Sequence, residues 1–458
     1  MTDELHRWTA SELVLAYRRR KLSPVEVTRA VLDRISRREP ELNAFVVLDP
    51  EAALADARAS EARWSASKPA GLVDGVPVSV KDLLLARGWP TRCGSLTVSS
   101  DGPWEIDAPA VARLREHGAV LLGKTTTSEF GLKGRGDSPL SGVTRNPWQP
   151  AHTPGGSSAG AVTAVAAGFG PLAVGTDGGG SIRVPSAFTG VVGLKPTFGR
   201  VPTSPAAVIG VPPHVGPITR SVRDAALLLN VLSEPDARDP FRLPEAPGDF
   251  RDALGRSWKR TRIGVSVTLG HARVDPEIVR ALERAALVFE DLGASVEAED
   301  PPIASPTATL RTLFSARAAF TVRSLDDAAR AKLDPVVLAA AREGEQLSAL
   351  DYLAAEAARA ALTEKMADYH CRFDLLLTPT TAEPAPRLDA APEPGRDATP
   401  FAYPFSLTRQ PAISVPVGTT RARLPIGLQI VGRPLEDGLV LAAADALEAQ
   451  LGALRAPD

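Results

Sequence analysis

Cysteine is scarce in this chain, and neither sign of charge prevails. Two cysteines among 458 residues cannot form a disulfide scaffold, and so low a number is typical of a reducing compartment, which predicts a cytoplasmic protein. The 52 Lys and Arg residues nearly balance the 54 Asp and Glu residues, for a formal net charge of -2. Such a balance argues against a basic nucleic-acid-binding surface. The six histidines lack the spacing of metal ligands, so we expect no metal and no other cofactor.

A hydrophobic run able to cross a membrane is also missing. The stretch from Ser158 to Thr176 carries no charge and nearly reaches the length of a membrane span. Gly168, Gly170 and Pro171 interrupt it, however, and Asp177 follows directly. We therefore expect no membrane contact, and we predict a buried helix, a turn and a buried strand over this stretch.

Short apolar strands alternate with helices along most of the chain. Strands are predicted near residues 44–48, 76–80, 119–123, 172–175, 262–267, 294–298, 373–377, 412–417 and 426–431. Such alternation is typical of a mostly parallel sheet that is covered on both faces. We therefore predict one large α/β domain over residues 1–458, with a central mixed, mostly parallel twisted sheet and helices on both faces. Within it we distinguish an N-terminal helical portion (1–70), a core (71–232), a variable helical region (233–370) and a C-terminal part of the core (371–458).

Glycine and serine are concentrated between residues 153 and 200. Gly155-Gly156-Ser157-Ser158 precedes a predicted helix, and Gly178-Gly179-Gly180-Ser181 follows a predicted strand. Consecutive glycines allow several backbone N–H groups to point into one small space, where they can hold a phosphate or a transient oxyanion. A serine beside such donors is arranged for nucleophilic acyl transfer.

Two other motifs in this segment are weaker. Ser158 stands in a G-x-S-x-G pattern, but the nucleophile elbow of that pattern needs a preceding strand, and residues 150–154 predict a loop. Residues 168–173 loosely match a dinucleotide-binding pattern, but Pro171 removes an N–H group and the predicted order is helix then strand, the reverse of what is needed. Neither pattern therefore predicts the chemistry of this segment.

A serine nucleophile without a partner histidine needs another base. Lys81 ends the apolar strand over residues 76–80, so its side chain could lie against the core. Burial would lower its pKa, because burial disfavours the cation. The alternatives are a lysine that reaches solvent or one that pairs with Asp82, and the residues alone favour these.

The combined motifs closely resemble the amidase signature family. The resemblance is carried by GGSSAG at residues 155–160, by GTDGGGSIRVPSAFTGVVGLKPTFGR at residues 175–200, by VSVKD at residues 78–82 and by TRNPW at residues 144–148. The C-terminal stretches FDLLLTPT, QPAISVPVG and LPIGLQIVG are also similar to that family. The resemblance covers nearly the whole chain and is weakest over residues 235–370. It implies the amidase signature fold.

The resemblance implies a Ser–cis-Ser–Lys triad. Ser181 would be the nucleophile, Ser157 the bridging serine on a cis peptide bond, and Lys81 the base. The N–H groups of the glycine run and of the nucleophile would form the oxyanion hole, contributed by Gly178, Gly179, Gly180 and Ser181.

Four further residues are expected to support the site. We expect Asp177 and Arg183 to pair with each other or with nearby backbone and so to hold the nucleophile loop. Ser158 would support the turn or cap the helix that follows. Phe130 would line the substrate pocket, or else be a core aromatic.

The activity implied is hydrolysis of amide bonds in small aryl or apolar acyl amides, with carbamates as a further substrate class and an esterase side activity. Residues 200–215, 306–350 and 395–410 show no readable pattern and would set substrate choice, and their composition predicts a mainly apolar pocket. The first alternative is the glutaminase (A) subunit of a tRNA-dependent amidotransferase, although the segment after Arg200 lacks the serine-rich polar run expected of it. The second is a non-enzymatic scaffold, which the presence of all three triad residues disfavours. Homodimers are common in that family, so the resemblance also implies a homodimer as a candidate assembly.

Overall fold

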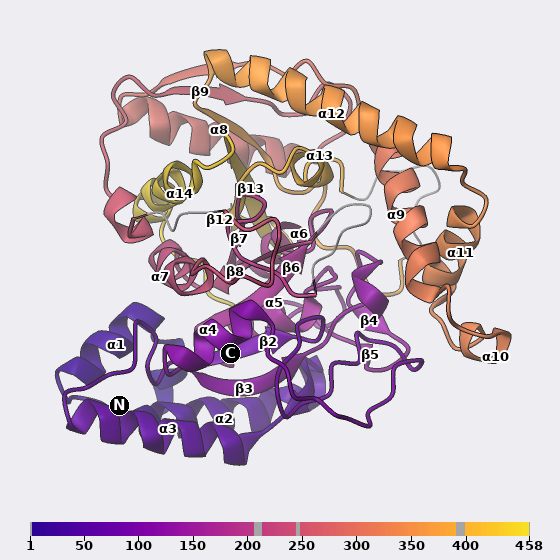
Figure 1. The fold of residues 1–458 in the computed structure, drawn as a ribbon. Coiled ribbons are helices and arrows are strands. Elements are labelled where there is room, and N and C mark those ends of the chain that lie inside the picture. The colour runs from indigo at the N-terminus through magenta and orange to yellow at the C-terminus, as the bar shows by residue number, and fades with distance from the viewer. Residues whose placement is uncertain (1, 206–212, 244–247, 391–398, 458) are drawn as a thin grey trace.

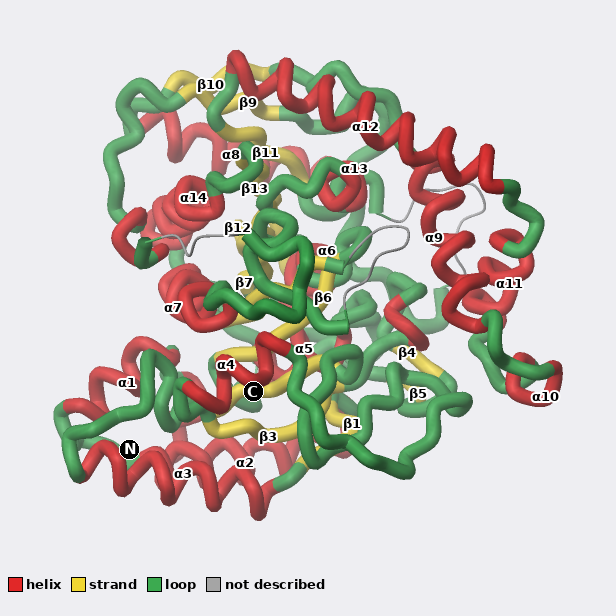
Figure 2. The backbone as a smooth tube through the Cα atoms, viewed as in Figure 1, coloured by secondary structure: helices red, strands yellow, loops and turns green. Residues whose placement is uncertain are grey.

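One large sheet organises the molecule. The computed structural model describes residues 2–205, 213–243, 248–390 and 399–457. Figure 1 shows helices on both sides of the sheet, and Figure 2 shows its strands as a band running through the molecule. The predicted single domain with a large mixed sheet flanked by helices is therefore confirmed.

The sheet has eleven strands in the order β1-β3-β2-β6-β8-β7-β12-β13-β11-β9-β10 among the described residues. Their bounds are β1 Phe45–Leu48, β2 Pro77–Lys81, β3 Val120–Thr125, β6 Leu172–Asp177, β7 Val192–Lys195, β8 His214–Thr219, β9 Arg262–Val265, β10 Ser295–Ala298, β11 Leu375–Pro379, β12 Ala412–Thr419 and β13 Pro425–Gly432. A separate two-stranded sheet pairs β4 (Asp137–Ser138) with β5 (Gly142–Val143).

The expected predominance of parallel pairing is wrong. In the described sheet β2 is parallel to β3 and β6, and β9 is parallel to β10 and β11, whereas the other six pairings are antiparallel. The antiparallel middle arises because β12 and β13 are joined by a short turn and because β7 and β8 lie between the two parallel parts. Neither β7 nor β8 was predicted from the sequence.

Helices cover both faces of the sheet. Their bounds are α1 Ala10–Arg18, α2 Pro24–Leu42, α3 Pro50–Ser65, α4 Pro109–Glu116, α5 Ala159–Ala167, α6 Arg183–Thr189, α7 Val222–Leu232, α8 Pro276–Asp291, α9 Thr307–Val322, α10 Asp327–Arg330, α11 Pro335–Gly344, α12 Ala349–Arg372, α13 Tyr403–Leu407 and α14 Asp437–Leu451, with the 3-10 helices η1 Thr2–Arg7, η2 Glu129–Gly131 and η3 Phe250–Ala253. None of the helices in the described ranges is long and apolar enough to cross a membrane.

The alternation of side chains along β2 decides which face receives Lys81. Val78 and Val80 pack into the cluster formed with α4, α7, α8 and α14. Since successive side chains of a strand point to opposite faces, Ser79 and Lys81 point toward the other face, which α5 and α6 cover. The last residue of β2 therefore faces the start of α5.

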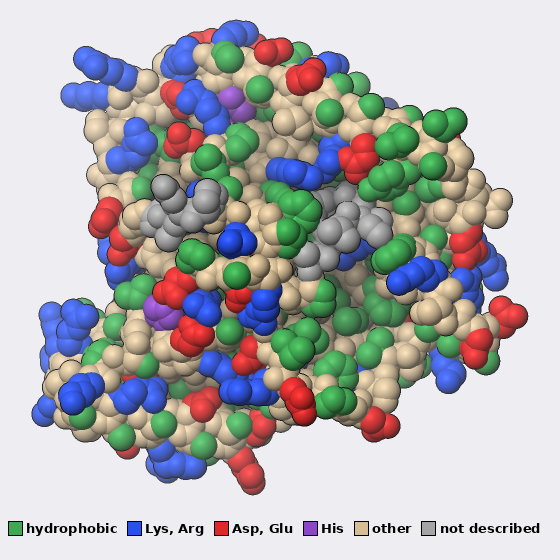
Figure 3. Space-filling model, in the orientation of Figure 1, with side chains coloured by type: hydrophobic (Ala, Val, Ile, Leu, Met, Phe, Trp, Pro, Cys, Tyr) green, Lys and Arg blue, Asp and Glu red, His purple; other side chains and the backbone are tan. Residues whose placement is uncertain are grey.

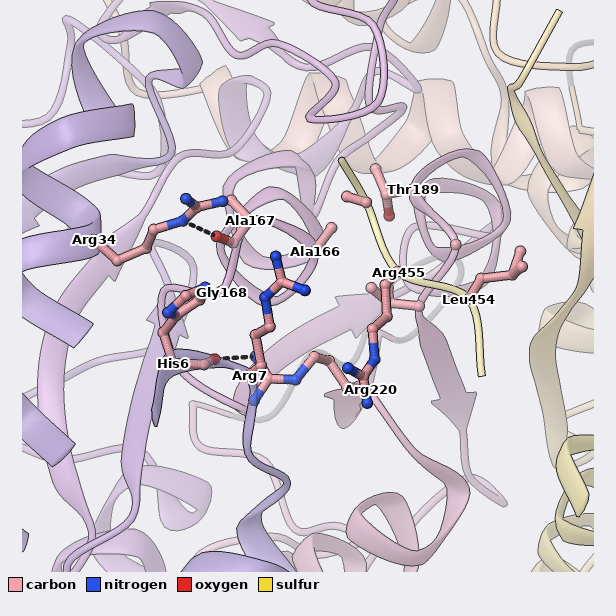
Figure 4. Close-up of a pocket in the computed structure, with 13 residues that line it drawn as sticks. His6, Arg7, Arg34, Ala166, Ala167, Gly168, Thr189, Arg220, Leu454 and Arg455 are labelled. Atoms are coloured by element: carbon pink, nitrogen blue, oxygen red, sulfur yellow. Dashed lines mark hydrogen bonds between the residues drawn. The ribbon is translucent and has the colours of Figure 1, made fainter. Parts of the chain in front are cut away.

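Arginines hold the far end of α5. The Nε atom of Arg34 donates to the carbonyl of Ala167 at 3.0 Å, and Arg220 donates to the carbonyl of His6 in η1 at 2.9 Å. Positive side chains complement the negative end of a helix dipole. The first bond ties α2 to the end of α5, and the second ties η1 to the segment that follows β8. Figure 4 shows the arginines around this helix end: Arg7, Arg34, Arg220 and Arg455.

Candidate active site

The amine of Lys81 is fully buried among hydroxyl groups. Its Nζ atom lies 2.8 Å from Ser157 Oγ, 2.9 Å from Ser158 Oγ and 2.9 Å from Thr176 Oγ1. Both alternatives from the sequence are excluded, because the amine does not reach solvent and Asp82 instead pairs with Lys124 at 3.0 Å. A lysine that could have been a surface residue is thus part of a buried polar cluster.

Burial sets the protonation of Lys81. The pKa of Lys81 lies well below its usual value, chiefly because the buried cation loses its hydration. The carboxylate of Asp177 raises this pKa, whereas the guanidinium of Arg317 lowers it further. Because desolvation prevails, the amine can be neutral and can accept a proton from a neighbouring hydroxyl.

Ser157 is placed by a tight glycine turn before α5. The peptide bond between Gly156 and Ser157 is cis, and Gly155 has a φ of 81°. A Cβ atom on Gly156 would lie 2.4 Å from the carbonyl oxygen of Arg135, so only glycine fits there. The turn holds the buried hydroxyl of Ser157 beside Lys81.

Ser181 follows β6 and lies in the same cleft as Ser157. The cleft has about 1010 Å³ of empty space and is open to solvent. The N–H of Ser158 donates to the carbonyl of Ser181 at 3.2 Å, which brings the two serine segments together. The structure therefore gathers Lys81, Ser157 and Ser181 at one place, although 100 residues separate the first from the last.

Asp177 and Arg183 form a fully buried ion pair beneath the loop that carries Ser181. Nε and Nη2 of Arg183 each donate to the carboxylate of Asp177 at 2.9 Å. Arg183 also donates to Gln429 on β13 and to Ser406 on α13, each at 2.7 Å. Burial alone would raise the pKa of Asp177, but Arg183, Lys195 and His214 lower it well below its usual value. The loop is thereby fixed to the C-terminal part of the core.

The expected oxyanion hole needs one correction. The N–H of Gly180 donates to Asp177 Oδ1 at 2.8 Å, so it is not available to an oxyanion. The candidate donors that remain are the N–H groups of Gly178, Gly179 and Ser181. Ala402 and Tyr403 lie behind Gly180 and Gly179. Of the segment 395–410, which was expected to set substrate choice, residues 395–398 lie outside the described ranges, and none of the described residues lines the cleft.

Ser158 supports Lys81 and does not cap α5 with its side chain. Its hydroxyl donates to the carbonyl of Thr176 at 3.1 Å and lies 2.9 Å from the amine of Lys81. Although it occupies the N-cap position of α5, its side chain makes no capping bond there. Thr176, which the sequence analysis did not single out, completes this cluster from the end of β6.

The walls of the cleft are mainly apolar. Figure 3 shows hydrophobic side chains around a hollow beside the lobe that carries α9 and α11. The segments 200–215 and 306–350, which had no readable pattern, contribute to the lining as expected, although residues 206–212 lie outside the described ranges. The apolar lining residues include Leu83, Leu84, Phe130, Pro202, Pro205, Pro213, Val215 and Phe314.

Two lining features were not predicted from the sequence. Cys93 lies at the wall of the cleft, and burial raises the pKa of its thiol to about 12. Arg317 on α9 brings a cation to the same cleft. Across the described ranges, no group of three or more His, Cys, Asp or Glu side chains could hold a metal ion.

Comparisons with known proteins point to one family. A sequence model described as Amidase matches residues 26–441. The chain is 36% identical over 462 residues to an acylamidase of Rhodococcus erythropolis, covering 98% of this chain and 97% of the relative. It is 34% identical over 476 residues to the (A) subunit of the glutamyl-tRNA(Gln) amidotransferase of Geobacter sp. (strain M21), covering 97% of each.

The structural comparison agrees with the sequence comparisons. The crystal structure of a bacterial aryl acylamidase of the amidase signature enzymes superposes with a TM-score of 0.91 at 33% identity, covering 96% of each chain. The fold, the glycine and serine motifs and these relatives lead to one conclusion. The chain belongs to the amidase signature family and is an amidase that hydrolyses amide bonds.

Proposed function

We propose that this amidase cleaves small aryl or apolar acyl amides through a serine acyl-enzyme. Ser181 is the nucleophile, Ser157 relays protons and Lys81 is the base. The observation that carries this proposal is the fully buried amine of Lys81, 2.8 Å from Ser157 Oγ in a cluster that borders the cleft containing Ser181.

The chemistry proceeds in two halves. Neutral Lys81 takes the proton of Ser157, which takes the proton of Ser181 as its oxygen attacks the amide carbonyl carbon. N–H groups of Gly178, Gly179 and Ser181 stabilise the negative oxygen of the tetrahedral intermediate. Ser157 then donates a proton to the departing amine nitrogen, and the C–N bond breaks. Water, deprotonated through the same relay, attacks the acyl-enzyme and releases the acid and the free serine.

The lining of the cleft supports an apolar substrate. Leu83, Phe130 and Phe314 can contact an aromatic ring or an aliphatic chain on either side of the scissile bond. Carbamates present the same carbonyl geometry, so the proposal includes them as a second substrate class. Phe130 is accordingly a substrate-contacting residue in this proposal.

The glutaminase function is a second candidate, because the glutaminase component of an amidotransferase is 34% identical to this chain. Glutamine carries an ammonium group, and burial of that cation requires an acidic partner. No Asp or Glu occurs among the described residues that line the cleft. This feature favours the amidase that acts alone on apolar amides.

A substrate panel tests the proposal. Without any partner protein, the purified chain should hydrolyse anilides and aryl carbamates faster than glutamine. The Ser181→Ala variant of the same preparation controls for contaminating hydrolases. Hydrolysis of glutamine with no action on anilides would contradict the proposal and favour the glutaminase.

A further inference from the structure

The peptide group between Asp177 and Gly178 is held from the side of β8. His214, the first residue of β8, lies opposite Asp177, the last residue of β6. Its Nδ1 atom donates to the carbonyl oxygen of Asp177 at 3.0 Å. This peptide group is planar and trans, so its C=O and N–H point in opposite directions, and a bond that fixes the carbonyl also fixes the N–H of Gly178. Gly178 lines the cleft and supplies one of the three candidate donors to the oxyanion.

The neutral ring of His214 has one hydrogen to donate. A carbonyl oxygen only accepts, so Nδ1 carries this hydrogen. Nε2 has no hydrogen-bond partner among the described residues, and His214 is only 3% exposed. Burial holds the pKa of His214 well below its usual value, and the amine of Lys195 lowers it further whereas Asp177 raises it. The ring therefore acts on its surroundings through its bond to the carbonyl of Asp177.

Neighbouring side chains keep the ring of His214 in place. Phe198 meets it edge to face, with the ring centroids 5.6 Å apart and the ring planes at 74°. The guanidinium of Arg409 lies over the ring of Phe198, 4.6 Å from its centroid. His214 is not among the described residues that line the cleft, so it supports the loop from behind rather than by contact with a substrate.

Asp177 holds the loop with both its side chain and its backbone. Its carboxylate accepts from the N–H of Gly180 at 2.8 Å and pairs with Arg183, whereas its carbonyl accepts from His214. A hydrogen bond accepted at a carbonyl also polarises the peptide group, which makes the N–H at the other end of that group a stronger donor. The bond from His214 thus affects both the direction and the strength of the Gly178 N–H.

We propose that His214 is a positioning residue of the oxyanion hole. By holding the carbonyl of Asp177, it orients and polarises the N–H of Gly178, which then binds the negative oxygen of the tetrahedral intermediate. This inference rests on the proposed function and deepens it, because it assigns a residue whose effect grows as charge develops on the substrate oxygen. Loss of His214 should therefore weaken binding of the transition state far more than binding of the substrate.

A pair of inhibitors with different carbonyl groups tests the inference. With 1,1,1-trifluoro-4-phenylbutan-2-one, the oxygen of Ser181 bonds to the carbonyl carbon, the serine proton passes through Ser157 to Lys81, and the carbonyl oxygen becomes an oxyanion. The methyl ketone 4-phenylbutan-2-one has the same apolar body and binds as a planar ketone. In His214→Leu, the inhibition constant of the trifluoromethyl ketone should rise about 10-fold or more, with a similar fall in kcat for a neutral anilide. The inhibition constant of the methyl ketone and the KM should change little.

Two further variants separate positioning from a general effect on structure. His214→Asn can place a side-chain N–H near the position of Nδ1, so it should regain most of the preference for the trifluoromethyl ketone. His370→Leu is the matched control, because His370 is 4% exposed and its Nδ1 lies 3.1 Å from the carbonyl oxygen of Phe373, outside the lining of the cleft. This control should keep the wild-type ratio of the two inhibition constants. Equal losses for both ketones in His214→Leu, or an unchanged ratio there, would overturn the role of His214.

A crystal structure of the wild-type enzyme with the trifluoromethyl ketone needs no variant at position 214. The oxyanion should lie within about 3.2 Å of the nitrogen of Gly178, while Nδ1 of His214 stays bonded to the carbonyl of Asp177. An oxyanion held by Gly179 and Ser181 alone would overturn the inference and leave the proposed function standing. A ketone that forms no bond to Ser181 would instead contradict the proposed function.

Discussion

The protonation of Lys81 controls when the proposed reaction can begin, since only a neutral amine can accept a proton from Ser157. Burial lowers the pKa of Lys81. We therefore expect kcat/KM for a neutral anilide to fall as the pH drops below this lowered pKa and to reach a plateau above it. A profile of kcat/KM from about pH 5 to about pH 10 measures this fall on the acid side, the acid limb of the profile. A rate that rises toward acid would contradict the assignment.

Arg317 should affect the pH at which kcat/KM falls on the acid side of the profile. Its charge lowers the pKa of Lys81, so the Arg317→Gln variant should show the limb at higher pH than the wild type. The pH profile of this variant measures the shift. An unchanged limb would mean that the guanidinium does not act on the base.

Removal of Ser181, the proposed nucleophile, should stop turnover. The Ser181→Ala variant should lose roughly 10³-fold or more in kcat while keeping its fold. Ser79→Ala is the matched control, since Ser79 is also a buried serine, on β2 with Lys81, and its hydroxyl has no hydrogen-bond partner within the described ranges. Equal activity of the two variants would refute the role of Ser181.

Single residues differed in how well the sequence could predict them. The glycine and serine motifs pointed to Ser157 and Ser181, which the structure places in one cleft, because such motifs are read directly along the chain. The burial of Lys81 could not be read this way, since its hydroxyl partners lie 76 to 95 residues away. The bond from Gly180 to Asp177 depends on how the loop folds back on itself, so the sequence could not show it.

At the scale of elements, the approach of α5 to the sheet depends on a residue without a side chain. A Cβ atom on Gly160 would lie 2.2 Å from the carbonyl oxygen of Ala44 and 2.4 Å from the backbone nitrogen of Thr126. Gly160→Ala should therefore destabilise the protein by about 1–3 kcal/mol, as overpacking does. Denaturant unfolding measures this loss. Gly134→Ala is the control, because a Cβ atom there meets nothing within 4 Å, and a similar loss in both variants would contradict the argument.

The contact between α14 and α7 should make stability depend on pH. Both oxygens of Glu448 accept from the N–H of Val222 at 3.1 Å, and burial raises the pKa of Glu448 from 4.5 to about 7. Folding therefore favours the protonated acid, so this contribution to stability is complete below pH 4.5 and is lost as the pH rises through about 7.

Thermal unfolding across that window measures the effect. The Tm of the Glu448→Gln variant should change less between these pH values than the Tm of the wild type. Glu364→Gln, at an exposed position on α12, should keep the wild-type dependence. Identical slopes in all three proteins would exclude the carboxyl of Glu448 as the cause.

Elements with regular apolar patterns were predicted well, and irregular ones were missed. Most predicted strands of the sheet lie within a few residues of the observed ones. Strands β7 and β8 were missed because Gly193, Gly216 and Pro217 interrupt their apolar patterns. Without these strands the antiparallel middle of the sheet could not be predicted.

At the scale of the whole molecule, Asp334 links the helical wall to the core. Loss of its bonds with Lys133 should let α9 and α11 move away from the cleft, while the triad stays in place. Asp334→Ala should therefore raise KM several-fold with a smaller effect on kcat. Steady-state kinetics measures both values. Asp326→Ala removes a comparable helix cap at α10 without a contact to the core, and an equal rise in KM there would contradict this view.

In the proposed mechanism, the reacting groups and one wall of the cleft come from different parts of the chain. Lys81, Ser157 and Ser181 come from the first half of the sequence, whereas the face of α9 that carries Phe314 and Arg317 belongs to the later helical region. Mutations on that face at positions other than Arg317, whose charge acts on Lys81, should therefore leave the reacting groups undisturbed. A mutant library confined to a few positions of α9 would test new substrate preferences while it leaves Ser181 unchanged. The same separation would let natural variants of the protein change substrate preference and keep the reacting groups.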